Sequence, residues 1–108
     1  MNSTTAALTA LYNRIPRRHT PDNVKDINNI LEEYEDLLIS IEAENAFYEK
    51  NIPIFFEQVE TVKATIKKSN DNKASKKNKD SFFDEASGAL KDSMQQLLEL
   101  YASGSRTA

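Results

Sequence analysis

Apolar residues between positions 22 and 68 recur at alternating steps of three and four. The series, here called the seam, is Val24, Ile27, Leu31, Tyr34, Leu38, Ile41, Asn45, Tyr48, Ile52, Phe55, Val59, Val62 and Ile66, and twelve of its thirteen members are apolar. A strand repeats every two residues and a helix every 3.6, so this spacing, kept in one phase, predicts a helical stripe.

Pro53 is the one strong helix breaker inside this segment. A proline in a helix interior removes a hydrogen bond at a cost of roughly 3 kcal/mol and pushes the preceding residue, Ile52, out of helical geometry. The seam nevertheless keeps its phase, which favours a kinked or tightly broken but roughly continuous helix over 21–68, about 70 Å long. The alternative is a helix that ends near Lys50, a second helix capped by Asn51, and a hairpin.

A shorter amphipathic segment precedes the seam. Its apolar residues fall at i, i+3, i+4 and i+7 and predict a helix over 4–15: Leu8, Leu11, Tyr12 and Ile15. A helix this short is marginal alone and must pack on another element. After Pro16 ends it, Thr20, Pro21 and Asp22 supply a cap, a first helical residue and a first-turn acid for the next helix.

The last third of the chain predicts a linker and one more helix. Residues 69–79 are rich in lysine, lack large apolar side chains and are expected to form a polar linker. A helix is expected over 81–102, with the stripe Phe83, Ala86, Leu90, Met94, Leu97 and Tyr101. Gly88 is expected to let another helix approach closely, and Gly104 to end the helix before a loose tail over 103–108.

Together these elements predict one all-α domain covering residues 1–108. We expect a helical bundle built on one long, Pro-kinked or Pro-broken central amphipathic helix with coiled-coil-like heptads. The short N-terminal helix covers its first half, and the C-terminal helix folds back antiparallel along its second half. Ile30 and Leu37 widen the seam beyond two heptad positions, which favours at least three helices around a core. Asn45 either fixes the register of the seam from a buried position or is hydrated there.

Charge is distributed in blocks along the chain, although the net charge is only -3. Residues 22–60 contain eleven acidic and two basic residues, and residues 61–79 contain seven lysines and one aspartate. Such blocks allow the lysines to screen the acidic segment, within the molecule or in a neighbour. The lysine segment lacks interleaved aromatic residues and arginines, which argues against nucleic acid as a partner.

Candidate chemistry is sparse. The chain has no cysteine, no Gly-rich phosphate loop and no Glu-x-x-His motif, and we interpret its one histidine, His19, as a solvated turn residue beside two arginines. We therefore expect no enzyme and no catalytic, cofactor-binding or metal-binding residue. The first ten residues resemble no signal peptide, and no run approaches about eighteen apolar residues, so we expect a cytoplasmic protein without a membrane partner.

A second apolar stripe surrounds Pro53 and contains Ala43, Phe47 and Ile54, with Phe56 near its edge. It either receives a helix of a partner or is covered by the chain's own last helix. From both stripes we select six candidate partner-binding residues: Phe47, Ile54, Phe55, Phe56, Asn45 and Tyr48.

These observations predict a non-enzymatic protein-protein interaction module. The favoured function is that of an adaptor, an assembly subunit or a small helical chaperone, which associates through the seam with itself or with another helical protein in a homo- or hetero-oligomer. The alternative is an acidic monomeric inhibitor or immunity-type protein that masks a basic surface of a toxin or nucleic-acid enzyme. Binding through apolar residues responds little to salt, whereas binding through the acidic block responds steeply.

Overall fold

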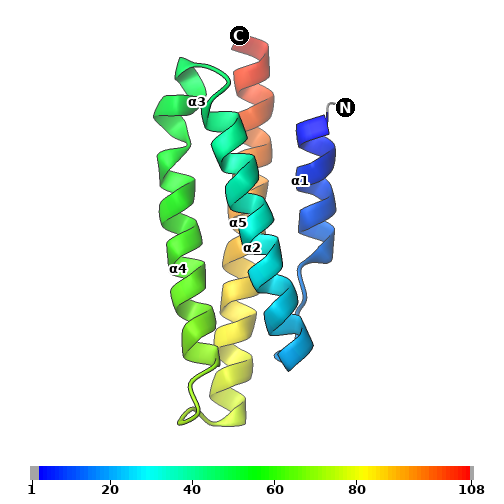
Figure 1. Cartoon of the computed structure of the whole chain (residues 1–108), viewed down its shortest axis with the longest axis vertical. Coiled ribbons are helices and arrows are strands. Elements are labelled where there is room, and N and C mark those ends of the chain that lie inside the picture. Colours follow the sequence, from blue (N-terminus) through cyan, green and yellow to red (C-terminus); the bar gives the residue numbers. More distant parts are fainter. Residues whose placement is uncertain (1–2, 108) are drawn as a thin grey trace.

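The structure, a computed structural model, describes the backbone of residues 3–107 and the side chains of residues 3–103. It contains five helices and, in this part of the chain, no strand (Figure 1). They are α1 (Ser3–Arg14), α2 (Pro21–Glu42), α3 (Ala46–Asn51), α4 (Pro53–Ser69) and α5 (Lys76–Thr107). The predicted all-α bundle is thus confirmed.

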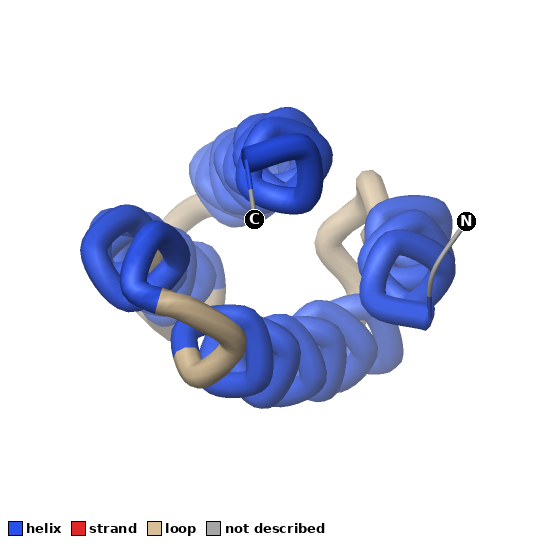
Figure 2. The backbone as a smooth tube through the Cα atoms, turned by 90° about the horizontal axis from the view of Figure 1, so that it is seen from above, coloured by secondary structure: helices blue, strands red, loops and turns tan. Residues whose placement is uncertain are grey.

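The four longer helices form an antiparallel bundle, and the short α3 lies at one end, above α4 (Figure 1). Successive long helices run in opposite directions (Figure 1), and seen from above they form a ring in the order α1, α2, α4, α5 (Figure 2). The 32 residues of α5 correspond to about 48 Å of helix, close to the 49 Å length of the molecule. This helix folds back along α4, as predicted.

The central segment is broken into three helices, which corrects the expectation of a roughly continuous helix over 21–68. The first break follows Glu42, and Asn45 then caps α3 by accepting a hydrogen bond from the backbone N–H of Tyr48 at 3.0 Å. The second break is at Ile52, and Pro53 occupies the first position of α4, where its missing N–H costs nothing. The chain reverses between α2 and α4, so the hairpin alternative describes it better, although the reversal starts well before Asn51.

The seam keeps its phase because α2, α3 and α4 all turn it toward one core. Its apolar members are buried except Val24, which packs against the core from its edge. Ser69 continues the series and is also buried, with its hydroxyl donating to the Ile66 carbonyl at 2.6 Å. The stripe expected to associate with another molecule therefore forms the interior of this chain.

The remaining core residues come from the two outer helices and from the widened face of α2. Ile30 is buried and Leu37 packs against the core, as expected for a bundle. The predicted stripes of both outer helices are buried, apart from the half-buried Tyr12: Leu8, Leu11, Ile15, Phe83, Ala86, Leu90, Met94, Leu97 and Tyr101.

The last helix is longer at both ends than 81–102. It begins at Lys76, where the Ser75 hydroxyl accepts a hydrogen bond from the Asn78 N–H at 3.1 Å, so that the linker shortens to residues 70–75. It also runs through Gly104 to Thr107. Lysine is a good helix former, and an interior glycine costs only about 1 kcal/mol, so neither feature stops a helix that is already anchored in a core. Ala108, the end of the expected tail, lies outside the described residues.

Gly88 does not mark a close helix contact, and this expectation is wrong. The residue is exposed, and a Cβ atom placed on it would meet nothing within 4 Å. Its neighbours Ala86 and Ser87 are the ones that point inward, and the Ser87 hydroxyl donates to the Pro16 carbonyl at 2.8 Å.

Replacing Gly88 by alanine should raise the free energy of unfolding by roughly 0.5–1 kcal/mol, because the open position gains helix propensity without a clash. Urea unfolding followed by circular dichroism measures the change. The reverse substitution at the neighbouring exposed position, Ala89→Gly, should lower stability by a similar amount. A destabilised Gly88→Ala variant would contradict the open environment of this residue.

Asn45→Ala should lower the free energy of unfolding by about 1 kcal/mol, because the first turn of α3 loses its side-chain cap. Asn45→Ser keeps a capping oxygen and should retain most of the stability. Equal losses in the two variants, measured by the same unfolding experiment, would show that Asn45 acts through something other than the cap.

Candidate functional site

Large apolar side chains are exposed at one end of the bundle. Ile39 and Ile54 are each 57% exposed and Phe47 is 38% exposed. They belong to the end of α2, to α3 and to the start of α4, which lie together at one end of the bundle (Figure 1). We call residues 39–57 the acidic end, for the charge described below.

Phe47 and Ile54 lie on the same side of the chain. They are seven residues apart, about two helical turns, and the intervening Ile52 has helical dihedral angles of φ -75° and ψ -33°. The Phe47 ring meets the edge of the Tyr48 ring at 5.5 Å. Of the expected second stripe, these two residues and the small Ala43 are exposed, whereas Phe56 is partly buried against the core.

The other three candidate partner-binding residues serve the fold. Phe55 is 4% exposed and Tyr48 is 2% exposed, because both belong to the seam. The Tyr48 hydroxyl donates to the Tyr101 carbonyl at 2.8 Å, and the two rings stack with centroids 5.3 Å apart, which fastens α3 to α5. Asn45 is engaged as the cap of α3. Phe55 and Tyr48 are therefore buried in the folded chain, whereas Asn45 is half-buried and its side-chain oxygen is engaged by the cap.

Ile39 is a surface residue that the sequence analysis missed. It lies outside both stripes, directly after the seam residue Leu38, and its isolated position facing away from the core was the available signal. It lies at the edge of a shallow surface depression between α2 and α3. The lining residues are Ile39, Glu42, Ala43, Asn45, Ala46 and Glu49.

Carboxylates surround these apolar side chains. Residues 39–57 contain Glu42, Glu44, Glu49 and Glu57 against the single cation Lys50. Glu44 accepts a hydrogen bond from the Tyr101 hydroxyl at 3.2 Å. No ion pair among the described side chains involves any of these four carboxylates. The end is therefore both apolar and negatively charged.

Screening of the acidic segment by lysines within the molecule is limited. Lys63 pairs with Glu35 and, at 3.7 Å, with Glu60. Its hydrogen bond to Glu35 is the main reason that the pKa of Lys63 is raised. The lysines of residues 67–79 lie at the opposite end of the bundle, in and beside the loop between α4 and α5 (Figure 1).

A buried polar network links three helices in the middle of the bundle. The hydroxyls of Tyr34 and Ser93 are 2.8 Å apart, and Ser93 donates to Gln58 Oε1 at 2.6 Å. Burial raises the pKa of Tyr34, an effect that the bond to Ser93 partly offsets. In these two hydrogen bonds the Ser93 hydroxyl meets a phenol and an amide, and neither is a histidine or a carboxylate that would act as a base to activate it. The network fixes how α2, α4 and α5 align.

Candidate metal-binding clusters and membrane-spanning helices are both absent from the described part of the chain. It contains no group of three or more metal-ligating side chains placed to hold an ion. Its helices also include none that is both long and apolar enough to cross a membrane. His19 lies in the loop between α1 and α2, with Nε2 at 3.4 Å from Asn70 Oδ1 and its ring against Phe83.

No protein-family model, curated protein or solved structure matches the chain.

The stability of the bundle should fall as the pH rises above roughly 10, the ordinary pKa of tyrosine. Because burial raises the pKa of Tyr34, the folded state keeps a proton that the unfolded chain releases, and alkaline solution favours unfolding. Tyr34→Phe should show a smaller decline between about pH 9 and 11 in urea unfolding. The control Tyr12→Phe, at a half-buried tyrosine, should decline like the wild type, and identical curves for all three would contradict the role of Tyr34.

Proposed function

We propose that this protein is a non-enzymatic helical interaction module that binds another protein through its acidic end. The observation that carries the proposal is the exposure of Ile39, Phe47 and Ile54 together at the end of the bundle that also holds four carboxylates. Buried apolar side chains supply most of the energy of a protein interface, and unpaired surface charges choose the partner and its orientation.

The partner that fits this end is a protein with an apolar or aromatic centre rimmed by lysine and arginine. Glu42, Glu49 and Glu57 form no ion pair with another described side chain, so they are free to meet such a rim. Phe47 is suited to the centre of the contact. Its ring is already held against Tyr48, so it loses little conformational freedom on binding.

The proposal draws on both expectations from the sequence. Like the favoured function, it makes the chain a protein-protein interaction module. The contact is made by the exposed residues Ile39, Phe47 and Ile54 instead of the seam, because the seam forms the interior. Like the alternative, the monomeric inhibitor, it describes an acidic bundle that stays closed and meets a basic surface of the partner, as an inhibitor or an adaptor would. Association through the seam would require the bundle to open and expose most of its core.

Site-specific photocrosslinking tests the proposal. A photoreactive phenylalanine analogue at position 47 should yield a heterologous product that the same analogue at position 77, at the other end of the molecule, does not yield. The protein so identified is then purified, and its affinity for the chain is measured by titration calorimetry. Phe47→Ser combined with Ile54→Ser should weaken binding at least tenfold, as expected for hot-spot residues.

Charge variants and mass measurements complete the test. Glu49→Gln with Glu57→Gln should weaken binding mainly at low salt, whereas the matched control Glu32→Gln with Glu85→Gln, at exposed positions away from this end, should not. Unchanged affinity of the serine double variant would overturn the proposal. So would a product at position 47 that consists only of two copies of this chain, with a dimer in light scattering.

A further inference from the structure

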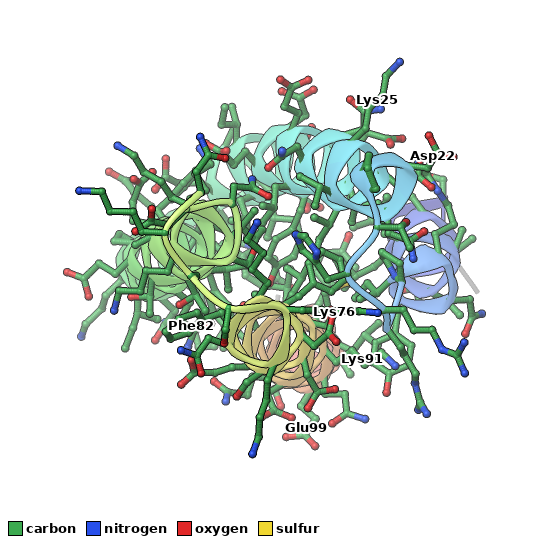
Figure 3. All side chains as sticks on the ribbon, turned by 90° about the horizontal axis from the view of Figure 1, so that it is seen from below. Asp22, Lys25, Lys76, Phe82, Lys91 and Glu99 are labelled. Carbon is green, nitrogen blue, oxygen red and sulfur yellow. The ribbon has the colours of Figure 1, made fainter. Side chains whose placement is uncertain are left out.

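Cations from separate segments of the chain meet at the end of the bundle opposite the acidic end. The fold brings the α1–α2 loop beside the start of α5, where a hollow is lined by Arg17, Arg18, His19, Thr20, Lys76, Asp80 and Asp84. Figure 3 shows Lys76 reaching from α5 toward that loop. The contact of His19 with Asn70 joins the α1–α2 loop to the loop after α4.

We call this surface the basic end and define it by eight side chains: Arg17, Arg18, Lys67, Lys68, Lys73, Lys76, Lys77 and Lys79. All are exposed except Lys79, which is half-buried, and none forms an ion pair with a described side chain. Four carboxylates share the region, Asp22, Asp71, Asp80 and Asp84, so an excess of four positive charges remains. Because Asp80 and Asp84 line the hollow itself, the surface suits an extended anion better than a small one.

The character of the surface identifies the kind of polyanion. The large exposed apolar side chains of the described chain lie at the acidic end, so the basic end offers neither an apolar wedge for a bilayer nor a hot spot for a protein. It offers arginines and lysines beside the polar side chains of Asn70, Asn72 and Ser75. Such a set contacts phosphates in series, as the backbone of a nucleic acid presents them.

We propose that the basic end binds the phosphate backbone of duplex nucleic acid, without sequence specificity. The lysine segment alone argued against this partner because it contains neither arginines nor interleaved aromatic residues. The fold supplies Arg17 and Arg18 from a segment some fifty residues away. Aromatic side chains serve to stack the bases of single strands, so contacts to the backbone of a duplex do not require them. A few phosphate contacts without base contacts give weak, strongly salt-dependent binding.

Fluorescence anisotropy with a labelled DNA duplex of about 24 base pairs tests the proposal on the full chain. With four phosphates neutralised, the affinity should fall roughly fiftyfold between about 50 and about 150 mM KCl. Lys76→Gln with Lys77→Gln should weaken binding at least threefold at low salt, and Arg17→Gln with Arg18→Gln should do the same. The control Lys50→Gln with Lys91→Gln removes two charges elsewhere and should have less effect, with circular dichroism verifying that each variant is folded.

Each other result overturns the proposal. One such result is the absence of duplex binding at about 20 mM KCl. Another is an equal loss of affinity in the control and in the Lys76/Lys77 variant, because equal losses would indicate a response to net charge alone. An arginine variant that binds like the wild type would show that the two loops do not act as one surface. Tighter binding to vesicles containing phosphatidylserine than to the duplex at the same salt would assign the surface to membranes instead. None of these results bears on the acidic end.

Discussion

The structure depends on one constraint, which is that every helix must bury its apolar stripe in the same core. A single helix over residues 21–69 would be about 74 Å long, and α1 and α5, about 18 and 48 Å long, would together cover its stripe from one side only. The chain resolves this by reversing between Glu42 and Pro53, so that α4 lies beside α2 and each covers part of the other's stripe. Asn45 and Pro53 make the reversal compatible with helix on both sides, one as a cap and the other as a first helical residue.

Burial of apolar area does not by itself specify one alignment of the helices, since apolar cores of suitable volume tolerate more than one packing. Directional contacts restrict the alignment here. The network of Tyr34, Ser93 and Gln58 ties the middles of three helices, and Tyr48 with Tyr101 ties α3 to the end of α5. Within the described residues no buried side-chain donor or acceptor lacks a partner, so these polar groups add specificity without an unsatisfied charge or dipole.

The sequence predicts the elements of this fold better than their arrangement. Helical periodicity identifies the stripes correctly, because burial requires the same 3-4 spacing wherever the helices lie. It does not reveal the reversal, because a turn of suitable length between two stripes preserves their phase, as residues 43–45 and the short α3 do. Capping is visible only where a clear stop accompanies it: Thr20 with Pro21 is recognisable, whereas Asn45 resembles a seam residue until the break beside it is known.

The same limit applies to the surfaces. Phe47 and Ile54 can be selected from the sequence because they lie off the seam, whereas the exposed Ile39 lies apart from any stripe and gives no periodic signal. The lysines of the basic end are evident in the sequence, but their juxtaposition with Arg17 and Arg18 is not, since it arises only when packing brings the α1–α2 loop beside the start of α5. That packing also carries the acidic residues around α3 to the far end of a molecule 49 Å long, several Debye lengths from the lysines. Charges so separated do not neutralise one another, so each end keeps the electrostatic potential of its own charges.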